Sequence, residues 1–151
     1  MSLSFKISDA ISVVSIFVSA GAAWYSYNTS VYVQDRQSII EELRALDDSG
    51  QKILEAGANF INSINSQSDL KASKEKLNIL LAQQAMAAIN ARRKLKPSDY
   101  QYAEDYVNAL RELGKISQNT NQSTEMRPWA EAFGRALDAR TTLAQAISAT
   151  M

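Results

Sequence analysis

"DRQSIIEELRALDDSGQKILEAGANFINSINS", residues 35–66, decides which fold this 151-residue chain can form. Its apolar and small residues recur at alternating steps of four and three, the heptad repeat of a helix that packs against other helices. The members of this seam are Ile39, Leu43, Leu46, Gly50, Ile53, Gly57, Phe60 and Ile64, and Ile40, Leu54 and Ile61 are expected to widen it. Each glycine costs about 1 kcal/mol of helix propensity relative to Ala, so both predict a closely approaching neighbour.

Three further amphipathic helices are predicted after this one, over approximately residues 69–95, 99–118 and 125–149. Ser98 and Gln101 are predicted to form a capping box at the start of the second of these. Short connections favour an antiparallel, coiled-coil-like four-helix bundle over residues 35–151. The second helix should turn Leu70, Leu80, Ala85, Ala88, Ile89 and Leu95 inward. The bundle seam is predicted to hold Leu43, Leu46, Ile53, Phe60, Leu77, Leu81, Leu110, Leu113, Trp129 and Phe133.

Composition favours an all-α protein and excludes several kinds of chemistry. Five glycines and two prolines are few for a sheet protein with many turns. The chain has no cysteine and no histidine, so thiol chemistry, imidazole metal ligands and histidine-activated nucleophiles are ruled out. Its 16 basic side chains balance 16 acidic ones, which leaves no net charge to attract nucleic acid. We therefore expect a non-enzymatic protein without a cofactor, a metal, a nucleic-acid partner or a small-molecule substrate.

The stretch that precedes the seam is uncharged from Ala10 to Gln34, a run of 25 residues. A helix needs ~20 mostly apolar residues to cross a bilayer, so residues 1–34 are predicted to hold a single transmembrane helix from about Ile7 to Tyr27. Small residues on one face would form a packing seam for a second span: Ser12, Ser15, Ser19, Ala22 and Ala23. Aromatic residues expected at the membrane interface are Trp24, Tyr25, Tyr27 and Tyr32.

Other interpretations of this stretch stay open. The short apolar run Ala10–Val18, followed by small residues, also fits a secretory signal. A soluble five-helix bundle would instead bury the segment as its first helix. A helix lying flat on a membrane is disfavoured, because its polar face usually carries Lys and Arg and this one carries only hydroxyls. The serine hydroxyls can bond back to their own helix without any partner. Several copies with the serine face turned inward would line a pore.

One dense basic cluster, "ARRKLKP" at Ala91–Pro97, ends the second predicted helix of the bundle. Cations in a last turn are stabilised by the helix dipole, which is reason enough for their position. If the helix over residues 35–66 leads away from the bilayer and the next one returns, the cluster also reaches anionic lipid headgroups. The residues concerned are Arg92, Arg93, Lys94 and Lys96. This reasoning places the bundle on the cytoplasmic side of the cell (inner) membrane.

The function expected from these features is protein–protein interaction. A single-pass membrane protein whose bundle self-associates, or docks a partner membrane protein as an accessory or scaffold subunit, accounts for both the uncharged stretch and the seams. Two alternatives stay open: an oligomeric pore-forming or membrane-perturbing effector, and a soluble five-helix binding protein.

Overall fold

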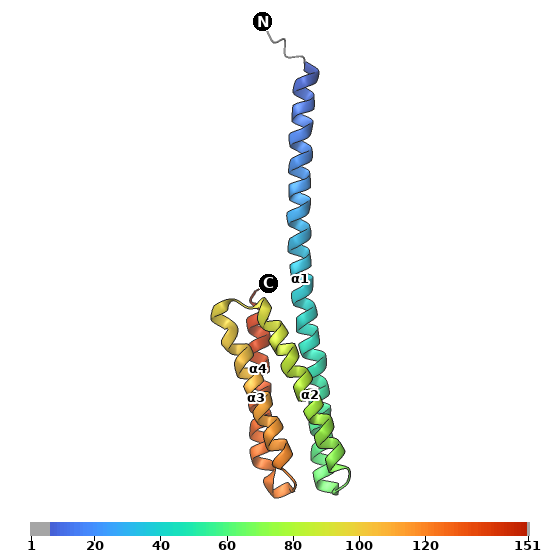
Figure 1. The fold of residues 1–151 in the computed structure, drawn as a ribbon, viewed down its shortest axis with the longest axis vertical. Helices are drawn as coiled ribbons and strands as arrows, with labels where there is room; N and C mark the ends of the chain where they lie inside the picture. Colours follow the sequence, from blue (N-terminus) through green and yellow to red (C-terminus); the bar gives the residue numbers. More distant parts are fainter. Residues whose placement is uncertain (1–6, 151) are drawn as a thin grey trace. The chain divides into compact units, whose positions relative to one another are not determined.

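The computed structural model describes residues 7–150, with side chains for Ser26, Thr29, Ser30 and from Tyr32 onward. The α-helices are α1 (Ile7–Ser66), α2 (Leu70–Ala91), α3 (Tyr100–Asn119) and α4 (Met126–Ser148) (Figure 1). Short 3-10 turns lie between them: η1 (Arg92–Lys94), η2 (Pro97–Asp99) and η3 (Ser123–Glu125). Since residues 7–150 contain helices and turns but no strand, the prediction of an all-helical protein is confirmed.

The chain divides into two compact units, one ending at Ser38 and the other beginning at Ile39. In the second unit the last part of α1 is followed by α2, α3 and α4, which run alternately in opposite directions (Figure 1). All four helices contribute to one apolar core, whose members include Leu46, Ile53, Phe60, Leu77, Tyr106, Leu113, Trp129, Leu143 and Ile147. The predicted helical bundle is therefore confirmed for this unit.

The predicted membrane-spanning helix has no support from the structure. No helix of the described residues combines the length and the apolar composition that crossing a bilayer requires. Many of the side chains on which that prediction depends lie outside the described residues. They are Ser12, Ser15, Ser19, Ala22, Ala23, Trp24, Tyr25 and Tyr27.

The heptad seam of α1 faces the core, but it widens on the side opposite to the predicted one. Leu43 is half-buried, and the other seven positions of the seam from Ile39 to Ile64 are buried. Ile40, Leu54 and Ile61 are exposed, at 39%, 42% and 37%, so their predicted inward position is wrong. Ala56 and Ser63 are buried instead, and the Ser63 Oγ lies 2.6 Å from the Ser73 Oγ of α2. These small residues let α2 approach α1 on this side, whereas the larger isoleucines and leucine stay outside.

The helix ends differ from the predicted ones because 3-10 turns replace the expected caps. α2 ends at Ala91, four residues earlier than predicted, and continues as η1. Ser98 lies inside η2, where its hydroxyl donates to Asp99 Oδ1 at 2.9 Å. The Gln101 side chain donates to Asp105 Oδ1. The predicted capping box of Ser98 and Gln101 therefore does not form. A capping box is found before α4, where the Glu125 carboxylate accepts from the backbone N–H of Gln122.

An aromatic cluster joins α1 to α4 where Gly57 lies on the seam. The Trp129 ring stacks on Phe133 with centroids 4.9 Å apart and lies 5.2 Å from the Phe60 ring. A Cβ atom added at Gly57 would lie 3.0 Å from Phe133 Cε2 and 3.4 Å from Trp129 Cη2. The glycine therefore permits the close approach of α4 that its place on the seam predicts.

We expect Gly57→Ala to lower the free energy of unfolding by roughly 1–3 kcal/mol, because overpacking against the stacked rings of Phe133 and Trp129 outweighs the helix propensity gained. Gly134→Ala in α4 is the matched control, since an added Cβ there meets no atom within 4 Å. It should raise the free energy of unfolding by about 1 kcal/mol. Denaturant unfolding followed by circular dichroism measures both, and an equal gain for the two variants would contradict the close approach.

Candidate functional site

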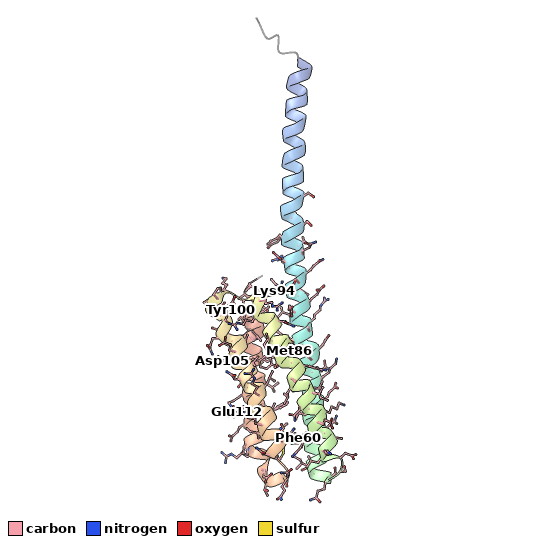
Figure 2. The ribbon with its side chains drawn as sticks, viewed as in Figure 1. Phe60, Met86, Lys94, Tyr100, Asp105 and Glu112 are labelled. Atoms are coloured by element: carbon pink, nitrogen blue, oxygen red, sulfur yellow. The ribbon has the colours of Figure 1, made fainter. Side chains whose placement is uncertain are left out.

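Helix α2 carries apolar side chains on two opposite faces. Toward the core it buries Leu77, Leu81 and Ala88. On the other side it exposes Ile79 at 52%, Met86 at 59% and Ile89 at 41%, with the exposed Ala82 between them. We call Ile79, Ala82, Met86 and Ile89 the outer face of α2; Figure 2 labels Met86.

Two interleaved heptad patterns along α2 account for the two faces. The buried positions 77, 81, 84, 88 and 91 step by four and three alternately, and the outer positions 79, 82, 86 and 89 step by three, four and three. At 100° per residue the second pattern lies on the opposite side of the helix from the first. The predicted inward position of Ile89 is therefore wrong. Ile79 and Met86 were not predicted to belong to an exposed apolar face, although their heptad spacing with Ala82 and Ile89 indicates one.

Exposed apolar groups of this kind are the usual mark of a protein contact. An isolated exposed isoleucine or methionine needs no explanation, but three on one helix face at heptad spacing form a continuous stripe. Methionine is flexible and polarisable, which makes it common on surfaces that adapt to a partner. The outer face of α2 is the candidate interaction site of the bundle.

A buried polar group lies on the core side of the same helix. Gln84 is fully buried, and its Nε2 donates to the backbone oxygen of Leu46 at 3.1 Å. Arg140 of α4 lies across Gly50, where an added Cβ would be 2.6 Å from the guanidinium carbon, and pairs with Asp47. Neither Gln84 Oε1 nor Arg140 Nε has a hydrogen-bond partner among the described residues. The burial of Gln84 was not predicted from the sequence, because glutamine is usually a surface residue.

Tyr106 of α3 is 2% exposed and lies beside Gln84 and Arg140. Burial raises the pKa of Tyr106 to about 12, and the neighbouring Gln84 side chain and the charge of Arg140 oppose the rise. The phenol therefore stays protonated at ordinary pH and is shielded from solvent by the bundle. Its environment is that of a core residue and not that of a reactive tyrosine, which needs a lowered pKa and access to substrate.

We expect stability to fall between pH 10 and pH 12 in a way that depends on Tyr106. An unfolded tyrosine loses its proton near 10.0, whereas folded Tyr106 keeps it to about 12, so the folded state is favoured below this window and loses that advantage across it. The loss amounts to about 2–3 kcal/mol. The free energy of unfolding, measured with denaturant at several pH values across this window, should fall less steeply with pH for Tyr106→Phe than for the unmodified chain. Tyr102→Phe, at an exposed position, should fall as the unmodified chain does.

A second buried hydrogen bond joins α3 to α4. The Trp129 indole N–H donates to the Ser117 hydroxyl at 2.8 Å, and this hydroxyl donates to the Leu113 backbone oxygen at 2.7 Å. Ser117 is fully buried. Its hydroxyl is the acceptor for the Trp129 indole N–H, the one side-chain polar group of the aromatic cluster.

We expect Ser117→Ala to lower the free energy of unfolding by about 1–3 kcal/mol, because it leaves the buried indole N–H without an acceptor. Ser148→Ala is the control, since Ser148 makes the same bond to a carbonyl one turn earlier but is exposed. Its effect should stay within about 0.5 kcal/mol. Equal effects of the two substitutions on denaturant unfolding would contradict this role of Ser117.

The predicted site residues of the bundle are distributed as follows. The seam residues Leu43 and Phe133 are half-buried, and the others are buried: Leu46, Ile53, Phe60, Leu77, Leu81, Leu110, Leu113 and Trp129. In the first unit, Tyr32 is 57% exposed, and the Arg36 guanidinium lies 5.1 Å from its ring centroid.

The basic cluster lies at the connection between α2 and α3. Arg92 pairs with Glu104 at 3.2 Å and lies 4.5 Å above the Tyr100 ring, so it binds α3. Arg93 and Lys96 are exposed and Lys94 is half-buried (Figure 2 labels Lys94 and Tyr100). The structure thus gives Arg92 an internal role and leaves the other three on the surface.

No group of three or more acidic, Cys or His residues within residues 7–150 is arranged to hold a metal ion. No protein-family model, curated protein or solved structure matches the chain.

Proposed function

We propose that this protein is a non-enzymatic interaction module, held at a membrane by residues 1–34, whose bundle associates through the outer face of α2. The observation that carries the proposal is the two-sided character of α2. One apolar stripe is used by the core, while the second, with Ile79, Met86 and Ile89, is left exposed. Burial of such a stripe against a partner contributes roughly 25 cal/mol for each Å² removed from water.

The internal organisation of the bundle supports this role. Gln84 and Ser117 are buried polar side chains that form hydrogen bonds between helices, and the buried Tyr106 is shielded from solvent. The surface pairs Arg92–Glu104 and Arg135–Glu112 also join helices of the same chain. These groups stabilise the bundle, whereas the outer face of α2 contributes nothing to its core.

The membrane part of the proposal rests on the sequence. The uncharged run from Ala10 to Gln34 is 25 residues long, a sufficient length for a spanning helix, which needs ~20 mostly apolar residues. On the cytoplasmic side, anionic lipids would attract Lys94 and Lys96, which favours that side for the bundle. A charged side chain at the centre of a span costs about 2.5–3.5 kcal/mol, so the proposal predicts a strong effect of arginine there.

We expect the full chain to stay in the membrane pellet after alkaline carbonate extraction, and Val14→Arg/Val18→Arg to move most of it to the supernatant. Ser26→Arg/Ser30→Arg, beyond the expected centre of the span, is the matched control and should leave the chain in the pellet. Immunoblots of pellet and supernatant measure the partition. Release of the unmodified chain by carbonate would refute the anchor.

A further inference from the structure

The outer face of α2 is symmetric about the level of Gln84. Ala82 and Met86 lie two residues before and after this level, and Ile79 and Ile89 lie five residues before and after it. The next exposed residues at these spacings lie nine residues before and after this level: Glu75 of α2, and Arg93 of η1, the 3-10 turn that continues α2. A surface with this arrangement can meet a second copy of itself across a two-fold axis, as the isologous interfaces of most homodimers do.

We propose that two copies of this chain associate through antiparallel α2 helices, with the two-fold axis at the level of Gln84. Ile79 of one copy then faces Ile89 of the other, and Ala82 faces Met86. The inference rests on the proposed function, because it names a second copy as the partner of the outer face.

The side-chain sizes fit this register. Ala82 is small and leaves room for the long, adaptable Met86 side chain of the second copy, and the two isoleucine contacts flank the centre on both sides. Steps of three and four place the four residues in one line, as knobs-into-holes packing of two helices at a shallow angle requires.

The charges at the two ends select the antiparallel orientation. Glu75 and Arg93 are both exposed, and neither forms an ion pair with another residue of the described part of the chain. In the antiparallel pair each Glu75 faces an Arg93, so the dimer gains two ion pairs. In a parallel pair Glu75 would face Glu75, and Arg93 would face Arg93, which is repulsive.

The size of the surface indicates a reversible dimer. A stable interface buries about 800 Å² on each partner, and one helix face with three large apolar side chains is smaller. Confinement of both copies to one membrane would raise their effective concentration and favour the dimer without any new contact.

The absence of cysteine from the chain allows a test of the register. Ile79→Cys and Ile89→Cys are introduced in separate full-length chains, which are oxidised in detergent micelles either alone or mixed. Residues 79 and 89 face each other in the antiparallel dimer, whereas two copies of residue 79 are separated by roughly 15 Å along the helices. We expect the mixed sample to form disulfide-linked dimers at least tenfold faster than either variant alone.

Leu54→Cys mixed with Ile61→Cys is the control, because these residues are similarly exposed but belong to α1. It should cross-link at the slow background rate. Faster cross-linking of Ile79→Cys with itself would indicate a parallel pair and overturn the proposal. Equal rates in all samples would overturn it as well.

Charge exchange tests the same register without cysteine. Glu75→Arg and Arg93→Glu each create two like-charge contacts, so each should raise the dissociation constant of the full chain at least fivefold. The double variant Glu75→Arg/Arg93→Glu restores opposite charges and should return the constant to within twofold of the original. Energy transfer between labelled chains in micelles measures these constants, and failure of the double variant to recover would contradict the antiparallel contact.

These outcomes are independent of the carbonate experiment. Release of the chain from membranes would refute the anchor and leave the cross-linking pattern unchanged. A chain that stays in the membrane and shows no preferred cross-link would refute the dimer and leave the anchor unchanged.

Discussion

The close packing of α4 on the glycine-containing seam of α1 is the constraint on which the bundle depends. Trp129 and Phe133 reach the backbone of α1 because Gly57 has no side chain, and Arg140 lies across α1 at Gly50 for the same reason. These contacts join the first and last helices of the bundle. They close the bundle around Phe60, Tyr106 and Leu113.

The polar residues of the core make the packing specific to one arrangement. The Trp129 indole finds its acceptor in Ser117, and Gln84 reaches a backbone oxygen of α1. A shift of one helix along its neighbour would leave these buried groups without partners, which is costly in an apolar interior. The phenol of Tyr106 is buried in the same interior, and this burial raises its pKa to about 12. These polar core residues therefore stabilise one packing of the four helices.

Helix α2 has one apolar face in the core and a second apolar face that is exposed. Leu77, Leu81 and Ala88 belong to the core, whereas Ile79, Met86 and Ile89 lie on the opposite side. A helix that is apolar on both faces is expected where both are covered. In the described bundle the chain itself covers only one of them, and the outer face of α2 stays exposed.

The sequence alone determined that the described part of the chain is helical and that the line from Ile39 to Ile64 faces the core. Its heptad spacing depends only on the geometry of one helix. Only the tertiary structure decided that Ile40, Leu54 and Ile61 stay outside while Ala56 and Ser63 are buried, that Gln84 enters the core, and that Ile89 faces outward. Periodicity defines a stripe on a helix, but it does not say which neighbour covers which side. That choice depends on the sizes of side chains that meet from different helices, and it is made only when the helices pack together.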